Sequence, residues 1–173
     1  GVLIETLALF INNTGKVGNT RVVSITNNID CIKKQNYIFD KKLPYWIIYR
    51  NEMFDSVCQQ LDFNIFTVDR QITNSVLKKS GDIRVLKSRN ISDDGSEIKN
   101  IDGYDSYIDY SDAENLSVFS LLNRDDIYLT PNMTYKPRVI KKEKNVLVNG
   151  SVAVLIPKEE ITLTDNQCKY FST

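Results

Sequence analysis

Residues Leu121–Lys158 read LLNRDDIYLTPNMTYKPRVIKKEKNVLVNGSVAVLIPK. This stretch carries the sharpest structural signals in the chain, and the remaining elements can be arranged around it. The branched and aromatic residues of Ile127–Thr130 predict a β-strand. A polar loop over residues 132–138 follows, and then a run of basic residues. Loops held at the ends of rigid strands are common sites of binding, so this loop is the first functional candidate.

A hairpin is predicted later in the same stretch. Asn149 and Gly150 separate the apolar segments Val146–Val148 and Val152–Val154, and both turn residues accept positive φ. Runs of apolar and branched residues elsewhere predict further strands. These strands are Val2–Ile11, Arg21–Thr26, Tyr45–Tyr49, Phe63–Val68 and Ile83–Lys87.

Helix signals are fewer. Glu52–Leu61 has an apolar stripe at helical spacing, which we expect to pack in a core, and Asn51 stands at its N-cap position. Ile29–Asn36 is a further short helical candidate. Ser111–Glu114 and Thr164–Gln167 both have the spacing of a capping box. The predicted fold class is therefore α+β, a mixed or antiparallel β-rich domain with a few short helices and long polar loops.

Composition limits the chemistry. The 173 residues include 22 basic and 22 acidic side chains, no histidine and three cysteines. The missing histidine removes the commonest general base and metal ligand, so we expect no catalytic residues and no metal site. No apolar run reaches the length of a membrane helix, and the few, scattered cysteines are typical of reduced thiols. We expect a cytoplasmic protein with no membrane partner.

The charges are unevenly placed. Residues 93–114 are acidic, whereas residues 136–144 are basic. If the fold separates the two segments, one basic face is available for phosphates. Arg, Lys, Asn and Gln are also the side chains that pair with base edges, and they cluster in three polar loops. We therefore expect double-stranded DNA as the partner. The candidate contacts are Arg70, Gln71, Thr73, Lys87, Arg89, Asn90, Asn132, Thr134, Tyr135, Lys136, Arg138, Lys141, Lys142 and Lys144.

These candidates divide by role. The side chains expected at or near base edges are Arg70, Gln71, Arg89, Asn90, Asn132, Tyr135 and Arg138. Those expected at phosphates are Lys136, Lys141, Lys142 and Lys144.

The chain also resembles a known family. The segments IRVLKSRNI (83–91), YDSYI (104–108) and LLNRDDIYLT (121–130) resemble the target-recognition domain of type I restriction specificity subunits. The stretch from Pro44 to Thr173 resembles the similar recognition region that ends adenine-specific DNA methyltransferases of type II restriction–modification systems. The chain departs from the pattern at Asp125, where the family usually has glycine, and at 132–135, which is often glycine-rich.

The resemblance implies a division of the chain. Residues 1–40 are expected to be the end of a methyltransferase catalytic domain, and residues 41–173 a DNA target-recognition domain cut short at its C-terminus. The catalytic motif and the glycines that bind the methyl donor have no counterpart here. The resemblance thus implies a non-catalytic piece without a cofactor. The longer protein would be a site-specific adenine methyltransferase that uses S-adenosylmethionine, with its catalytic domain upstream in the same chain.

Two alternatives come from other classes of function. The region could be a scaffold that docks on another restriction–modification subunit, with Tyr45, Trp46 and Tyr49 as an exposed aromatic patch. A metal-dependent nuclease could instead use Glu97 and Lys99. Exposure of Trp46 would favour the scaffold, and magnesium-dependent cleavage of DNA would identify the nuclease.

Overall fold

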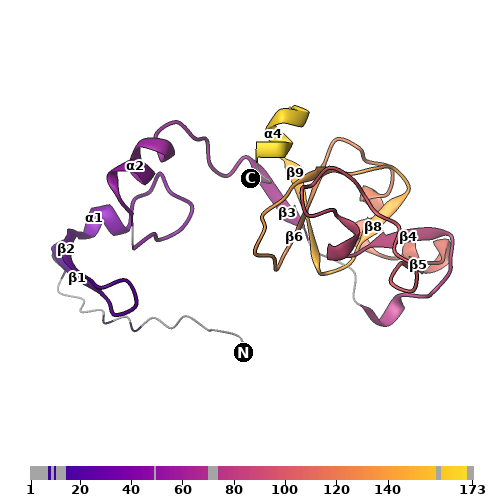
Figure 1. The fold of residues 1–173 in the computed structure, drawn as a ribbon, viewed down its shortest axis with the longest axis horizontal. Helices are drawn as coiled ribbons and strands as arrows, with labels where there is room; N and C mark the ends of the chain where they lie inside the picture. The colour runs from indigo at the N-terminus through magenta and orange to yellow at the C-terminus, as the bar shows by residue number, and fades with distance from the viewer. Residues whose placement is uncertain are drawn as a thin grey trace. The chain divides into compact units, whose positions relative to one another are not determined.

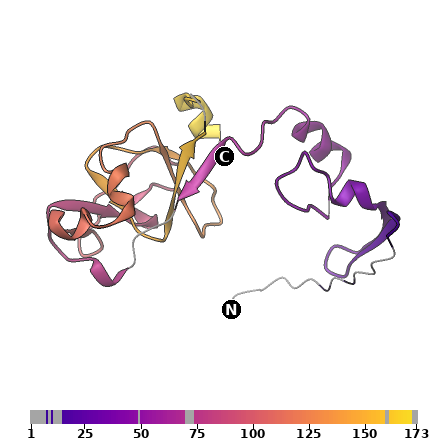
Figure 2. The same cartoon turned by 180° about the vertical axis from the view of Figure 1, so that it is seen from behind.

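The computed structural model describes residues 8, 10, 15–48, 50–69, 74–158 and 161–170. The chain divides into two compact units, which we call unit 1 (Gly1–Phe63) and unit 2 (Asn64–Thr173). Figures 1 and 2 show the elements of each unit from opposite sides. The division expected from the family resemblance falls after residue 40, and the compact units divide between Phe63 and Asn64.

The elements are short in both units. Unit 1 contains β1 (Asn19–Ser24), β2 (Ile29–Lys34), α1 (Gln35–Ile38) and α2 (Glu52–Cys58). The strands of unit 2 are β3 (Phe66–Asp69), β4 (Ile83–Leu86), β5 (Ser106–Ile108), β6 (Tyr128–Pro131), β7 (Ile140–Lys141), β8 (Val146–Val148) and β9 (Val152–Pro157). Its helices are α3 (Tyr110–Ala113), α4 (Asp165–Tyr170) and the 3-10 helices η1 (Asn74–Val76), η2 (Ser88–Asn90) and η3 (Ser117–Leu121).

Unit 1 is built on a two-stranded antiparallel ribbon. β1 pairs with β2 from Asn19↔Lys34 to Ser24↔Ile29. The strand expected at Arg21–Thr26 is present, but the short helix expected at Ile29–Asn36 is wrong over most of its length. Side chains of β2 alternate between partly buried and exposed, the period of a strand, and helix α1 begins only at Gln35. The strand predicted at Val2–Ile11 lies outside the described residues, apart from Ala8 and Phe10.

Helix α2 has the predicted cap without the predicted burial. The backbone N–H of Phe54 donates to Asn51 Oδ1 at 2.8 Å, which confirms the N-cap. The helix has no buried residue, however, and Met53 is 77% exposed. The expected core role of its stripe is therefore wrong, because periodicity reports that one face is apolar and not what covers that face.

Residues 45–48 form no strand, contrary to the prediction for Tyr45–Tyr49. Trp46 is 63% exposed and packs edge-to-face on Phe39, with ring centroids 4.6 Å apart. A strand needs a neighbour to satisfy its backbone groups, and the ribbon of β1 and β2 pairs only with itself in the described part of unit 1.

Unit 2 contains two small sheets. One has the order β3-β9-β6-β7 and is antiparallel throughout. The other has the order β5-β4-β8, in which β4 pairs antiparallel with β5 and parallel with β8. Figure 1 shows β4, β5 and β8 together on one side of the unit and β3, β6 and β9 on the other. The predicted strands at Ile83–Lys87 and Ile127–Thr130 are confirmed within a residue.

One apolar cluster joins the two sheets. Its fully buried members include Val85 and Leu86 of β4, Leu129 of β6, Leu147 of β8 and Val152 of β9. Burying a side chain of this kind stabilises the fold by about 1.5–3 kcal/mol. The core therefore holds together the strand ends that carry the candidate loops.

The hairpin predicted at Asn149-Gly150 is wrong. β8 and β9 belong to different sheets, and the turn between them carries the chain from one sheet to the other. All three residues of β8 are buried, so the strand has no solvent face and pairs parallel with β4 instead. The Asn149 N–H extends that ladder by donating to the carbonyl of Leu86 at 3.0 Å.

The two predicted capping boxes have different outcomes. At the start of α4, Gln167 N–H donates to Thr164 Oγ1 at 3.2 Å and Thr164 N–H donates to Gln167 Oε1 at 2.9 Å, which confirms the second box. The first is wrong. Helix α3 begins at Tyr110, whose N–H donates to Asp82 Oδ2 at 2.9 Å, so a carboxylate distant in sequence takes the expected place of Ser111.

The architecture confirms the predicted fold class. Among the regular elements of the described residues, strands outnumber helices and pair largely antiparallel, with short α- and 3-10 helices between them. Within these residues, no helix has both the length and the apolar character needed to cross a membrane.

Candidate nucleic-acid interface

Three polar segments meet where strands of the two sheets end. Segment 87–90 follows β4 and segment 149–151 follows β8. Because β4 and β8 are parallel, both segments begin at the same end of their sheet, where the two strands finish. Segment 132–138 follows β6, and Pro131 at the end of β6 is paired with Val152 at the start of β9. The fold therefore brings together two of the three polar loops expected to contact DNA.

Hydrogen bonds tie these segments to one another. The backbone N–H of Ser88 donates to Ser151 Oγ at 3.0 Å. Asn132 donates twice across the junction, from its backbone N–H to the Ser151 carbonyl at 3.0 Å and from Nδ2 to the Gly150 carbonyl at 2.7 Å. The segments thus form one connected surface, and part of the Asn132 amide is used inside it.

Arg138 joins segment 132–138 to segment 87–90. Its Nη1 donates to Thr134 Oγ1 at 2.8 Å and to the Lys136 carbonyl at 3.2 Å. Its Nη2 donates to the Ser88 carbonyl at 3.4 Å. The residue is 7% exposed. Arg138, expected at a base edge, therefore has its guanidinium committed to the protein itself.

Asn90 is likewise committed inside the fold. It is fully buried, and its Nδ2 donates to Asp105 Oδ1 at 2.6 Å and to the Lys99 carbonyl at 3.1 Å. Its Oδ1 accepts the backbone N–H of Lys87 at 2.8 Å. This side chain shapes the turn at η2 and offers no free edge to a base.

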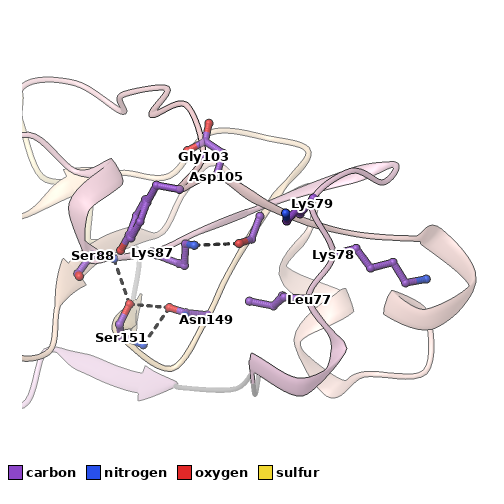
Figure 3. Close-up of a pocket in the computed structure, with 11 residues that line it drawn as sticks. Leu77, Lys78, Lys79, Lys87, Ser88, Gly103, Asp105, Asn149 and Ser151 are labelled. Carbon is purple, nitrogen blue, oxygen red and sulfur yellow. Dashed lines mark hydrogen bonds between the residues drawn. The ribbon is translucent and has the colours of Figure 1, made fainter.

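A groove of about 560 Å³ opens beside these segments. Its lining residues include Lys79, Lys87, Ser88, Tyr104, Ser106 and Ser151. Figure 3 shows how most of them lie. The Lys87 ammonium lies 3.9 Å from the centroid of the Tyr104 ring and donates to Ser106 Oγ at 2.9 Å. The Arg89 guanidinium lies 5.5 Å from the same ring centroid. One aromatic ring therefore holds two cations beside the groove.

The two lysines at the start of this groove differ in their partners. Lys78 donates to Asp109 and to Asp112, and these hydrogen bonds raise its pKa to about 12. Lys79 has no carboxylate within ion-pair distance in the described part of the chain. Lys78 is thus neutralised locally, whereas Lys79 adds uncompensated positive charge.

The loop after β6 presents its most exposed side chains outward. Tyr135 is fully exposed and Met133 is 93% exposed. Lys136 lies 3.7 Å from Asp93, with both side chains largely in solvent. Thr134 is turned inward, where its Oγ1 accepts the Lys136 N–H and the Arg138 guanidinium. Of this loop, Tyr135 and Lys136 are therefore the predicted contacts that remain available to a ligand.

The basic run beyond the loop is not one continuous face. Lys142 is 2% exposed, and its Nζ donates to the carbonyls of Leu122, Arg124 and Glu143 at 2.8–3.0 Å. Lys144 pairs with Asp125 at 3.4 Å, and Lys141 is exposed on the edge strand β7. The acidic and basic segments are thus partly interleaved rather than separated, as the contacts of Asp93 with Lys136 and Arg138 also show.

Arg70, Gln71 and Thr73 lie outside the described residues. Lys79 and Tyr104 belong to the surface although the sequence patterns did not predict them. Tyr104 follows the Asp102-Gly103 turn, and an aromatic residue beside a turn and near basic residues is a weak signal for a binding surface.

The residues considered for a nuclease form no recognisable metal centre. Within the described ranges, no group of three or more acidic or cysteine side chains is arranged to hold a metal ion. Glu97 and Lys99 flank Ile98, which bridges to Ile91, and the two charged side chains lie 3.9 Å apart at the surface.

Comparisons of the chain with protein-family models, curated protein sequences and solved structures return no match.

Proposed function

We propose that unit 2 docks on double-stranded DNA and reads several base pairs, as the target-recognition region of an adenine-specific methyltransferase of a restriction–modification system. The observation that carries the proposal is the meeting of segments 87–90 and 132–138 around segment 149–151. The resulting surface offers cations, hydroxyls and an exposed tyrosine, the groups that contact phosphates and bases. Catalysis, with S-adenosylmethionine as methyl donor, is assigned to a methyltransferase domain upstream in a longer chain.

Within this proposal the candidate residues take revised roles. Tyr135 and Lys136 project from the loop and are the side chains best placed to enter a groove of the duplex. Asn90, Arg138 and Lys142 support the surface from inside. The three cysteines are free thiols, which is consistent with a role on DNA in the cytoplasm.

The test is fluorescence anisotropy of the 173-residue chain on a random-sequence duplex over a range of salt concentrations. We expect binding that weakens steeply with salt, followed by enrichment of a preferred sequence from a randomised pool. Tyr135→Ser and Lys136→Gln should weaken binding, whereas the exposed Lys158→Gln, at the far end of β9, should not. Absence of binding at low salt, both for this chain and for a chain that includes the catalytic domain, would overturn the proposal.

A second candidate is a docking scaffold, and one observation favours it. Trp46 and the neighbouring Tyr45 are 63% and 75% exposed, although aromatic residues of this size are usually buried at least in part. Trp46 is the single tryptophan of the chain, so its fluorescence reports this position alone. Loss of acrylamide quenching upon addition of a methyltransferase subunit would support docking, and unchanged quenching upon complex formation would exclude Trp46 from the contact.

A further inference from the structure

We infer that the groove beside Tyr104 is a phosphate-binding site, in which Lys79 and Lys87 from the lining, together with Arg89 next to the Tyr104 ring, hold a backbone phosphate. The inference rests on the proposed DNA-binding function for the source of that phosphate. It deepens the proposal by assigning Arg89 to a phosphate instead of a base edge, and by adding Lys79 and Tyr104 to the surface.

Three cationic side chains at the groove carry charge that no neighbouring carboxylate compensates. Lys79, Lys87 and Arg89 have no carboxylate within ion-pair distance in the part of the chain that the structure describes, although the segments around them are rich in aspartate. The acidic side chains around the groove already have cationic partners: Asp105, which lines the groove, pairs with Arg84 at 3.1 Å, and Asp109 and Asp112 bind Lys78. Cations gathered without counter-charges repel each other, and a bound anion would relieve that repulsion.

The side chains of Lys87 and Arg89 are oriented by the Tyr104 ring. Lys87 donates one of its three N–H groups to Ser106 and lies against the Tyr104 ring, which leaves donors for a ligand in the groove. Arg89 is exposed and lies by the same ring. Tyr104 is thus a positioning residue, because its ring restricts two long side chains that would otherwise sample many rotamers.

The functional groups around the groove suit a phosphate as ligand. Arginine, lysine and serine hydroxyls are common partners of phosphate oxygens. Ser88 lines the groove as well. Adenine edges are read by planar amides. The amides here, Asn149 in the lining of the groove and Asn90 next to Arg89, are buried, and both make hydrogen bonds inside the fold. The volume of about 560 Å³ accommodates a phosphate with its sugar.

The experiment compares Lys79→Gln, Arg89→Gln and the double variant with wild type, in the full 173-residue chain. Both side chains are exposed, so the variants should fold normally. The matched control is Lys158→Gln, an exposed lysine about 20 Å away at the other end of β9, by the rise of a strand. Two measurements are made on each protein: the salt dependence of duplex binding, and amide chemical shifts of 88–90 and 103–104 during titration with inorganic phosphate.

We expect each single variant to lower the slope of log K against log salt by about one unit, and the double variant by about two. Phosphate should shift the groove amides of wild type and of Lys158→Gln, but not those of the double variant. Duplex binding with unchanged slopes in the groove variants would overturn this inference and leave the proposed function standing. Phosphate binding that the double variant loses, when neither this chain nor a chain that includes the catalytic domain binds duplex, would support the anion site and contradict the DNA function.

Discussion

Asn90 Nδ2 donates to Asp105 Oδ1 at 2.6 Å, across 15 residues of sequence. The contact joins the segment that follows β4 to the segment that precedes β5. Asp105 also accepts from Arg84 at 3.1 Å, so one carboxylate is held by an amide and a guanidinium together. Asp105, a lining residue of the groove, is thereby held in one position, and such preorganisation lowers the conformational cost of binding a ligand.

Replacing Asn90 by alanine should reduce the free energy of unfolding by about 1–3 kcal/mol, because buried partners are left without hydrogen bonds. The affected groups are the Lys87 N–H, the Lys99 carbonyl and Asp105. Urea unfolding followed by circular dichroism measures the change. The exposed Asn100→Ala serves as control and should stay within about 0.5 kcal/mol of wild type. An equally small effect of Asn90→Ala would show that the network contributes nothing measurable.

Arg138→Lys tests whether this residue positions the loop or reads a base. Lysine keeps the charge but cannot bridge Thr134, the Lys136 carbonyl and the Ser88 carbonyl with a planar fork. We expect weaker binding to all duplex sequences and faster hydrogen exchange of amides 134–136, with the preferred sequence unchanged. A relaxed preference at a single base pair, with unchanged exchange, would instead assign Arg138 to direct base readout.

Tyr135→Ser should separate binding from stability. The side chain is fully exposed, so the free energy of unfolding should change by less than about 0.5 kcal/mol. If Tyr135 lies against a base, affinity for the preferred duplex should fall by about 1–3 kcal/mol, with relaxed preference at one position. Anisotropy titrations on the preferred and on a random duplex give both quantities. Equal affinity of wild type and variant for both duplexes would remove Tyr135 from the interface.

Some local signals in the sequence predicted local structure correctly. The cap at Asn51 and the box at Thr164–Gln167 depend on hydrogen bonds within three residues, and both form as expected. The strand at Ile127–Thr130 depends on composition over four residues and is also found. These features need no knowledge of the rest of the chain.

The failures concern partners distant in sequence. A turn at Asn149-Gly150 was correctly expected. The pairing of β8 with β4, however, depends on a strand some sixty residues earlier. The Ser88–Ser151 hydrogen bond at the end of these strands likewise joins residues 63 positions apart. Asn90 and Arg138 are expected at base edges because their side chains can pair with bases. The same donors and acceptors serve equally well inside the fold, and burial alone decides between the two uses.

Lys142 illustrates the same limit, since a lysine in a basic run is normally exposed. Here its ammonium donates to three backbone carbonyls under the η3–β6 connection. Lys142→Met would retain much of the side chain's volume and leave those carbonyls without their donor. We expect a loss of about 1–3 kcal/mol in the free energy of unfolding at pH 7, measured by urea unfolding. The exposed Lys141→Met, one residue earlier, is the matched control and should change stability far less.

The pH dependence of that loss has a definite sign. Burial lowers the pKa of Lys142 to about 8, below the value of 10.5 for an unperturbed lysine. Between these two values the unfolded chain binds a proton that the folded chain has released, so the stability of wild type gains as pH rises through this window. The methionine variant lacks this gain, and the stability gap between the two proteins should therefore widen from pH 7 to pH 9.5. Titration of the tyrosines and cysteines is common to both proteins and cancels in the difference. If the difference in the free energy of unfolding between the two proteins narrowed instead, the hydrogen bonds to the three carbonyls would stabilise the protonated ammonium by more than burial destabilises it.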